Sequence, residues 1–408
     1  MTTSGVKIIK KKWELFSATD YTSLMWPNFE LLRIWGLFPY KIDNNSNLIL
    51  ASKPGFIYSS IVSSLHVVLL GIILYLIDIS KVLEYDSVPG TLQGNCYLLL
   101  GWSIEIVSYL QTSRRLKFLQ QLDNVATTIP SIEFKKLSKY IHFKDLFGFL
   151  FLIIQSANAY SKSLALFGSK LFSVYTIIVI FLMDTLYINC VLVIGSSFKT
   201  INNKLLILKS TIENDEPHLL RRIYHEKKNP FILMKIRDIK YQHNDVCEVI
   251  NKLNQTFSLQ LIATVTLTFA EITFSLYFYI LQLLDMKGIN LEKQIWFSYF
   301  STGVTYHAVK LAAIILSCEI AKDQSAKTGV IVHELLIDTV DKQVKDELQL
   351  FSLQILHRDN TFTARGLSID APLMTSIVGG ITQYLLILVQ FLISSKSCGT
   401  IFDRSPAT

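Results

Sequence analysis

Four ionisable residues stand inside stretches of the chain that are otherwise apolar: Glu105, Asp184, Glu271 and Lys310. A charged side chain within hydrocarbon is costly, so such residues face the interior of a helix bundle or mark a functional site. Two interpretations follow. Each charge either pairs internally or lies at a helix end, or it contributes a polar group to a small-molecule pocket.

Aromatic residues surround these charges in the same apolar stretches. Ligand pockets are mostly apolar and aromatic, with a few placed polar groups, although aromatic residues also form lipid belts and helix contacts. Besides the four charged residues, the candidate ligand pocket includes Trp102, Tyr109, Tyr160, Tyr187, Phe274, Tyr277 and Tyr306.

The motifs of common enzyme classes are absent from the sequence. It holds no zinc-hydrolase H-E-x-x-H, P-loop, dinucleotide-binding glycine pattern, nucleophile elbow or kinase signature. Its five cysteines are scattered without the spacing of metal ligands or of a disulfide framework. We therefore predict a protein that is not an enzyme and that uses no metal or cofactor.

The composition is that of a membrane protein. Of the 408 residues, 50% are hydrophobic and 17% are charged, whereas soluble chains carry about a quarter charged residues. A helix needs about 20 apolar residues to cross the hydrocarbon core. Seven stretches qualify: 56–77, 92–110, 143–165, 171–194, 259–284, 295–320 and 371–393. We predict an all-α, polytopic membrane protein with seven transmembrane helices, of which the second and third are the most polar.

The net charge of +7 follows membrane topology and does not indicate a nucleic-acid partner. Lys and Arg gather before the first span and between spans two and three, four and five, and six and seven. Positively charged loops stay in the cytosol. The pattern predicts a cytosolic N-terminus and, because seven is odd, an extracellular C-terminus.

The segment before the last span has a helical pattern of its own. From Val332 to Ile355, apolar residues recur every three or four positions with charged residues between them, which predicts one amphipathic helix. Its apolar stripe packs either on its own subunit or between subunits. The predicted organisation is a cytosolic segment 1–55, six spans with the pocket and inner loops in 56–320, a cytosolic anchor helix in 321–369, the last span in 370–394 and an extracellular tail 395–408.

The last span carries a weakly polar stripe. Its members recur every three or four residues on one helix face: Thr375, Gly379, Thr382 or Gln383, Leu386 and Gln390. A polar stripe interrupted by leucine is typical of a channel-lining helix with a hydrophobic constriction. Small residues also permit plain helix packing. One helix cannot enclose a pore, so the pore interpretation requires several subunits around an axis.

Three stretches resemble the insect gustatory receptor family, which is related to the insect odorant receptors. Residues 351–370, FSLQILHRDNTFTARGLSID, are similar to the run before the last span of the family. Residues 384–391, YLLILVQF, match most of the signature T-Y-x5-Q-F, with Gln383 in place of its threonine. IWGLFPY at 34–40 resembles a common opening of the family.

The resemblance implies a tetrameric, ligand-gated, non-selective cation channel opened by a small-molecule tastant. The last span would line the pore, Gln390 and Phe391 would match its gating end, and each subunit would hold a pocket in its outer membrane half. The partners would be the tastant, cations, membrane lipids and identical or related receptor subunits, in the plasma membrane of sensory neurons.

Three alternatives remain open at this stage. An odorant receptor channel subunit would share the architecture. A G-protein-coupled receptor also has seven helices but would place the N-terminus outside, and neither D-R-Y nor N-P-x-x-Y is present. A transporter would show internal repeats and interrupted spans in matching halves, which the sequence lacks.

Overall fold

The computed structural model describes residues 15–43, 48–83, 88–156, 164–213, 221–284, 291–339 and 341–402. These residues are mainly helical, with two short antiparallel hairpins, β1–β2 and β3–β4. The elements in chain order are α1 (Tyr21–Ile34), β1 (Tyr40–Ile42), β2 (Ile49–Ala51), α2 (Lys53–Leu74), the π-helix η1 (Tyr75–Ile79), α3 (Val88–Leu110), α4 (Thr112–Ala126), α5 (Ser131–Ser156), α6 (Leu164–Glu213), α7 (Arg221–Leu284), α8 (Leu291–Asp338), α9 (Lys342–Leu356), β3 (Thr363–Ala364), β4 (Leu367–Ser368) and α10 (Ala371–Phe402).

The predicted all-α, polytopic class is confirmed. The seven predicted spans fall on α2, α3, α5, α6, α7, α8 and α10. Five segments of the described chain are long and apolar enough to cross a membrane: Lys53–Ile79, Phe167–Ile212, Pro230–Leu283, Phe300–Asp338 and Ala371–Phe391. The helices α3 and α5, which carry the second and third spans, fall outside this set because polar side chains such as Glu105 and Asp145 lower their hydropathy.

The predicted third span, 143–165, is wrong at its end. Helix α5 ends at Ser156, and residues 164 and 165 already belong to α6. Tyr160 of the candidate pocket lies between these helices, outside the described residues. Hydropathy alone measures the apolarity of a window and does not register where a helix ends.

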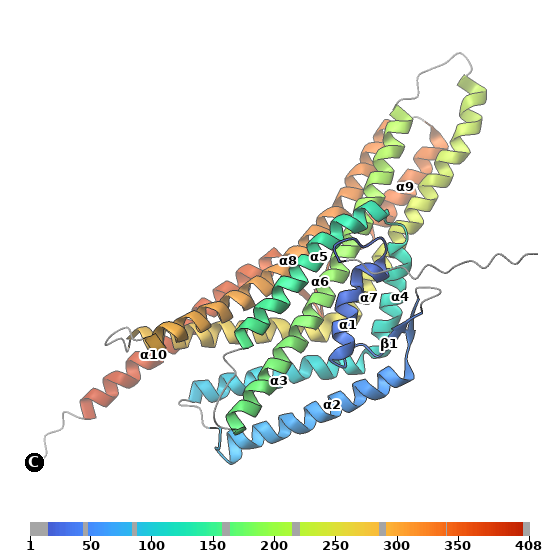
Figure 1. The fold of residues 1–408 in the computed structure, drawn as a ribbon. Helices are drawn as coiled ribbons and strands as arrows, with labels where there is room; N and C mark the ends of the chain where they lie inside the picture. The colour runs from blue at the N-terminus through green and yellow to red at the C-terminus, as the bar shows by residue number, and fades with distance from the viewer. Residues whose placement is uncertain are drawn as a thin grey trace, which may run out of the picture.

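Three helices extend far beyond the thickness of a bilayer. α6, α7 and α8 contain 50, 64 and 48 residues, which at 1.5 Å per residue gives lengths of about 70–100 Å. A hydrocarbon core is about 30 Å thick. The excess lengths run together past the bundle, where α9 lies beside them (Figure 1). We call this part, made of the far ends of α6, α7 and α8 together with α9, the extension.

The predicted single amphipathic helix over 332–355 is wrong, because the structure divides it between two helices. α8 ends at Asp338, and the carboxylate of Asp341 caps α9 by accepting a hydrogen bond from the backbone N–H of Val344 (3.0 Å). The apolar period continues across the break since both helices pack on one core. Val332 of α8 and Leu348 of α9 are both 0% exposed within the single chain, so this stripe packs on its own subunit.

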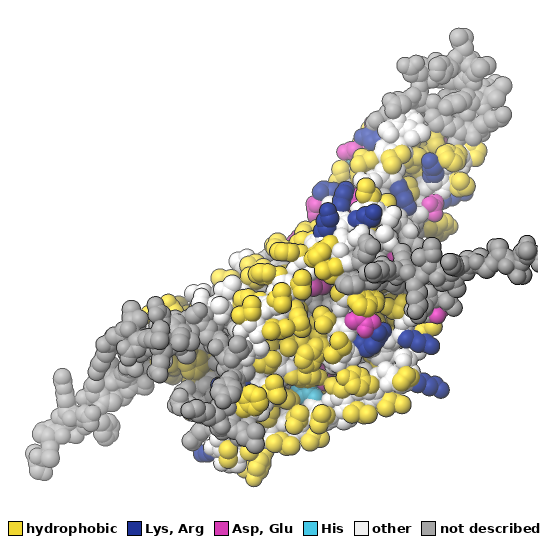
Figure 2. All heavy atoms as spheres, in the orientation of Figure 1, with side chains coloured by type: hydrophobic (Ala, Val, Ile, Leu, Met, Phe, Trp, Pro, Cys, Tyr) yellow, Lys and Arg dark blue, Asp and Glu magenta, His cyan; other side chains and the backbone are white. Residues whose placement is uncertain are grey.

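The surface of the bundle is apolar where lipid would surround it. Figure 2 shows hydrophobic side chains over the bundle, while Lys and Arg gather toward the extension. On α2, the side chains of Ile61, Leu65 and Val68 are 57–62% exposed. In α6, by contrast, 89% of the most apolar window is buried. α6 is therefore the central helix, and most polar groups within this window are enclosed by protein.

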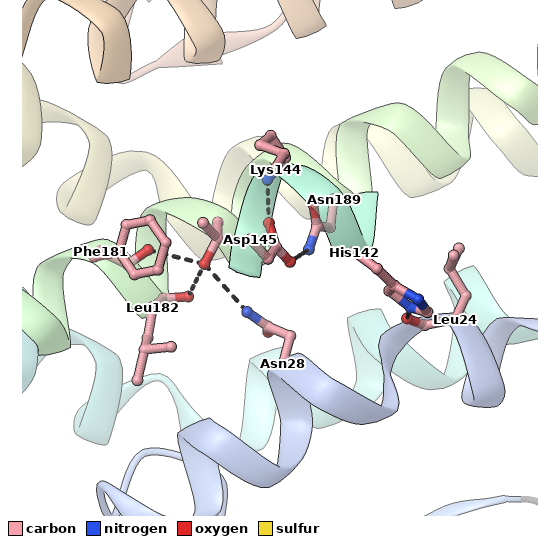
Figure 3. Close-up of polar contacts among 9 residues, drawn as sticks. Leu24, Asn28, His142, Lys144, Asp145, Phe181, Leu182 and Asn189 are labelled. Carbon is pink, nitrogen blue, oxygen red and sulfur yellow. Dashed lines mark hydrogen bonds and ion pairs between the residues drawn. The ribbon is translucent and has the colours of Figure 1, made fainter. Parts of the chain in front are cut away.

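Helix α1 is tied to α5 and α6 by polar contacts (Figure 3). Asn28 donates from Nδ2 to Oγ1 of Thr185 (3.1 Å). The imidazole of His142 accepts the backbone N–H of Phe16 at Nδ1 (3.1 Å), so its proton is on Nε2, which donates to the carbonyl of Leu24 (2.9 Å). These bonds fix the N-terminal region against the bundle.

Candidate pore helix and buried polar clusters

Helix α10 packs on its own chain along one narrow face. Leu373, Ile377 and Ile381 recur every four residues and are 7–8% exposed, and the helix contacts α7 and α8. The ring of Tyr384 meets Phe269 of α7 edge to face, with centroids 5.7 Å apart. Only 6% of the apolar window of α10 is buried. Most of this helix therefore lacks a covering within the single chain.

The predicted polar stripe lies opposite that packing face. At about 100° per residue, its members fall about 140–220° around the helix from Ile377. All of them are exposed in the single chain: Thr375, Gly379, Thr382, Leu386 and Gln390. Gln383 is also exposed and lies at the edge of the same face. The face is thus free of contact with the rest of its own subunit.

Two further residues of the last span lie on the packing side of α10, away from the polar stripe. Phe391 comes within about 40° of the line through Ile377, so it projects from the packing side of α10 rather than from the polar stripe; it is 71% exposed. Leu388 is half-buried on the same side. Helical period accounts for both, because positions 11 and 14 residues after Ile377 return to nearly the same face.

Two carboxylates hold the start of α10. Glu319 of α8 accepts the backbone N–H of Ala371 (2.9 Å), and Asp370 accepts that of Leu373 (3.3 Å). Negative charge at a helix N-terminus is favourable because it meets unpaired N–H groups and the positive end of the helix dipole. The first turn of α10 is thereby fixed to α8.

Asp184 and Lys310 form an ion pair inside the bundle. Lys310 Nζ on α8 lies 3.4 Å from Asp184 Oδ2 on α6, and the two side chains are 5% and 1% exposed. Thr264 and Gln260 of α7 donate to the other carboxylate oxygen, Oδ1, at 2.9 and 3.5 Å. The ring of Tyr306 lies one turn before Lys310, with its centroid 5.8 Å from Nζ. Three helices thus bring three of the predicted pocket residues together.

Glu271 lies on α7, next to the same region. Its Oε2 accepts a hydrogen bond from Nε2 of Gln93 on α3 (2.8 Å), and the residue is 9% exposed. Lys310 is within electrostatic range. Phe274, one turn further along α7, is half-buried, and Tyr277 is 9% exposed.

Glu105 belongs to a separate cluster formed by α2, α3 and α6. Its Oε2 contacts Nδ1 of His66, and its Oε1 accepts a hydrogen bond from Ser63 (3.3 Å). The imidazole ring of His66 lies edge to face against Phe172 and Tyr175, with centroids 4.5 and 5.0 Å away. Glu105 therefore has an internal partner.

The other predicted pocket residues are dispersed. Trp102 is half-buried, and its indole Nε1 has no hydrogen-bond partner within the described part of the chain. The hydroxyl of Tyr109 lies 2.7 Å from that of Ser60. Tyr187 is fully buried, with its hydroxyl 3.3 Å from Sγ of Cys318. These aromatics serve helix packing at different places.

Sequence reasoning missed several polar partners in these clusters. His66, Gln93, Gln260 and Thr264 all contact a predicted charged residue, and Glu319 caps α10. Most of them are polar residues inside or beside apolar stretches. These polar residues are visible in the sequence, but the residues that they contact lie up to 178 positions away along the chain.

In the extension, an acid on α9 meets two bases on α7. Glu347 contacts Lys240 and lies 3.0 Å from Nε of Arg237; its side chain is 8% exposed. Burial alone would raise the pKa of Glu347, but hydrogen bonds from Lys240 and Arg237 outweigh it and hold the pKa below its ordinary value. The pair fastens α9 to α7.

The hairpin before α10 is also bound to α7. Asn254 donates from Nδ2 to the carbonyl of Thr361 (2.8 Å), and its Oδ1 accepts the backbone N–H of Thr363 (3.2 Å). One side chain thus satisfies two backbone groups of the connection between α9 and α10. The connection between α9 and α10 is thereby held against α7.

These features define a polytopic membrane protein in which a central bundle continues into a helical extension. The family model for the 7tm Chemosensory receptor matches residues 27–395. The chain belongs to this family, which confirms the resemblance found in the sequence. Members of the family are receptors rather than enzymes.

Individual relatives from Drosophila melanogaster match in a shorter region. Putative gustatory receptor 28b is 36% identical over 160 residues, which is 38% of this chain and 34% of that protein. The gustatory receptor for sugar taste 43a is 25% identical over 167 residues, 40% of this chain and 37% of that protein. The matches span about a third of the length of these relatives.

A solved structure has a similar fold. The insect olfactory receptor OR5 from Machilis hrabei in complex with eugenol superposes with a TM-score of 0.65 and 12% sequence identity. The superposition covers 90% of this chain and 97% of that receptor. At this identity the likeness concerns the fold alone.

Proposed function

We propose that this chain is one subunit of a tetrameric, non-selective cation channel that a small-molecule tastant opens. The exposed polar face of α10 from each subunit would line a central pore. Assembly with related receptor subunits would serve as well as a homotetramer, since either arrangement places one α10 at the axis per subunit. The plasma membrane of sensory neurons is the proposed location, with the N-terminus in the cytosol.

The observation that carries this proposal is the packing of α10. The helix contacts its own chain through Leu373, Ile377 and Ile381, while Thr375, Gly379, Thr382 and Gln390 on the other side are exposed. Hydroxyl, amide and backbone groups that face lipid tails find no hydrogen-bond partner there, but in a pore they can coordinate ions and water. Leu386 on the same face supplies an apolar ring that would close the pore by dewetting.

The proposed ligand site is the polar layer between α3, α6, α7 and α8. Asp184, Glu271, Tyr306 and Lys310 place charged and hydroxyl groups among aromatic side chains there, which is the chemistry of a small-molecule pocket. The fold supports this assignment, since a receptor with a small molecule in its structure shares it.

The proposal is tested with cysteine substitutions on the two faces of α10. In cells that express the receptor, a panel of sugars, bitter compounds and amino acids is first used to find an agonist. Thr382→Cys and Gly379→Cys should then render the agonist current sensitive to a water-soluble thiol reagent, and Ile377→Cys should not. Equal sensitivity of both faces would refute the pore assignment.

Membrane topology distinguishes the proposed channel from the main alternative, a G-protein-coupled receptor. An epitope added after Thr408 should stain intact cells, and one before Met1 should stain only permeabilised cells. The reverse staining would favour a G-protein-coupled receptor.

A further inference from the structure

Two faces of neighbouring helices form a layer of buried polar groups within the bundle. Thr264, Thr268 and Glu271 follow one another at four and three residues on α7, so they share one side of that helix. Tyr306 and Lys310 are likewise one turn apart on α8. Because Thr264 bonds Asp184 and Lys310 pairs with the same carboxylate, the two faces meet around α6.

Several polar atoms in this layer have no hydrogen-bond partner among the described residues. They are the hydroxyls of Thr268 and Tyr306 and Nδ1 of His307, on residues that are 0%, 9% and 8% exposed. Buried polar groups in native proteins are normally satisfied, because each unmade hydrogen bond costs about 1–3 kcal/mol. Tyr306 and His307 lie one turn before Lys310 on α8, and Thr268 lies one turn before Glu271 on α7. The unpartnered atoms therefore belong to the same helix turns as the charged groups, where a polar molecule could be held.

The charges in the layer do not balance. Lys310 Nζ lies 3.4 Å from the carboxylate of Asp184, so the one positive charge of Lys310 is paired with Asp184. Glu271 has a hydrogen bond from the neutral amide of Gln93 but no Lys, Arg or His within ion-pair distance among the described residues. With Glu271 ionised, two carboxylates would share one ammonium group. In a medium of low dielectric constant, a carboxylate without a cation is unfavourable.

We propose that the ligand of this receptor carries a protonated amine, which pairs with Glu271 between α3, α7 and α8. The inference rests on the proposed receptor function and names the ligand class of the same site. An ammonium group supplies the missing positive charge and favours the ionised carboxylate. The stacked rings of Tyr306 and Phe151, whose centroids are 6.3 Å apart, offer apolar surface for the rest of the molecule. An anionic ligand would meet the excess negative charge.

The test compares three probes of nearly equal size: 2-phenylethylamine, 2-phenylethanol and phenylacetate. Binding to the purified full-length protein in lipid nanodiscs is measured by calorimetry at neutral pH. The amine should bind at least about tenfold more tightly than the alcohol, and the carboxylate should bind weakest. Glu271→Gln should remove this preference, with the affinity for the alcohol changing less than about twofold. Asp323→Asn, which removes one exposed acid from the cytosolic part of α8, should leave the preference intact.

Each result has a definite meaning. Equal binding of amine and alcohol, absence of amine binding, or an amine preference that survives in Glu271→Gln would overturn the proposal, provided that the variant elutes as a monodisperse assembly like the wild type. Current recordings separate this from the channel proposal. Amine binding without current rejects the channel and keeps the ligand class. Current opened equally well by neutral and protonated compounds rejects the ligand class and keeps the channel.

Discussion

Breaking the Asp184–Lys310 pair should strongly destabilise the bundle. The side chains are 1% and 5% exposed, with 3.4 Å between Oδ2 and Nζ. Removing one member of a buried ion pair costs about 3–5 kcal/mol, because the other charge is left without compensation. Lys310→Met should cost more than Asp184→Asn, since it leaves Asp184 without its ion-pair partner and also removes the positive charge that acts on Glu271 at longer range. Asp184→Asn leaves Lys310 within range of Glu271.

The loss can be measured as thermal stability in lipid nanodiscs, using size-exclusion chromatography of heated samples. At roughly 1–2 °C per kcal/mol for a chain of this length, each single variant should lose about 3–10 °C. The double variant should recover most of that loss. Lys327→Met removes an exposed partner of Asp323 on the same helix and should change the midpoint by less than about 2 °C. Additive losses in the double variant would refute the buried pair.

Three further substitutions test the extension and the proposed role of α10. Glu347→Gln should destabilise the extension above pH 5, and the effect should fade as the pH falls through the lowered pKa of Glu347, because a carboxyl whose folded pKa is lowered loses its stabilising contribution there. Limited proteolysis as a function of pH measures the effect. A difference that stays constant with pH would contradict the ion pair. Asn254→Ala should shift the agonist dose–response by loosening the hairpin before α10, and an unchanged curve would exclude that link. Leu386→Asn, on the polar stripe of α10, should raise resting current. Leu388→Asn, on the packing side, should impair assembly instead. Identical effects would contradict the placement of these two residues on opposite faces of α10.

Much of the architecture could be predicted from the sequence because lipid imposes it. Apolar stretches of about 20 residues must be helices, and each of the seven predicted spans falls on a helix, the third on α5 up to Ser156. The positions where helices end were harder to predict. The break before Asp341 preserves the apolar period, so only the capping aspartate signals it.

The site was predictable by residue type but not by partner. The sequence singled out charged residues in the spans, and the structure brings Asp184, Tyr306 and Lys310 together. The sequence could not indicate that Glu105 pairs with His66 while Glu271 meets only an amide. These outcomes depend on helix packing between residues far apart in the chain. The same holds for Phe391 and Leu388, whose surroundings depend on which face of α10 packs on α7 and α8.

The most direct test of the proposed channel is electrical recording from the purified protein in a bilayer of defined lipids, without G proteins or nucleotides. A pore formed by α10 predicts agonist-evoked cation current under these conditions, with little selectivity among monovalent cations because the described part of that helix carries no charged side chain before Lys396. Agonist binding without current would contradict it, and α10 would then be a packing helix only.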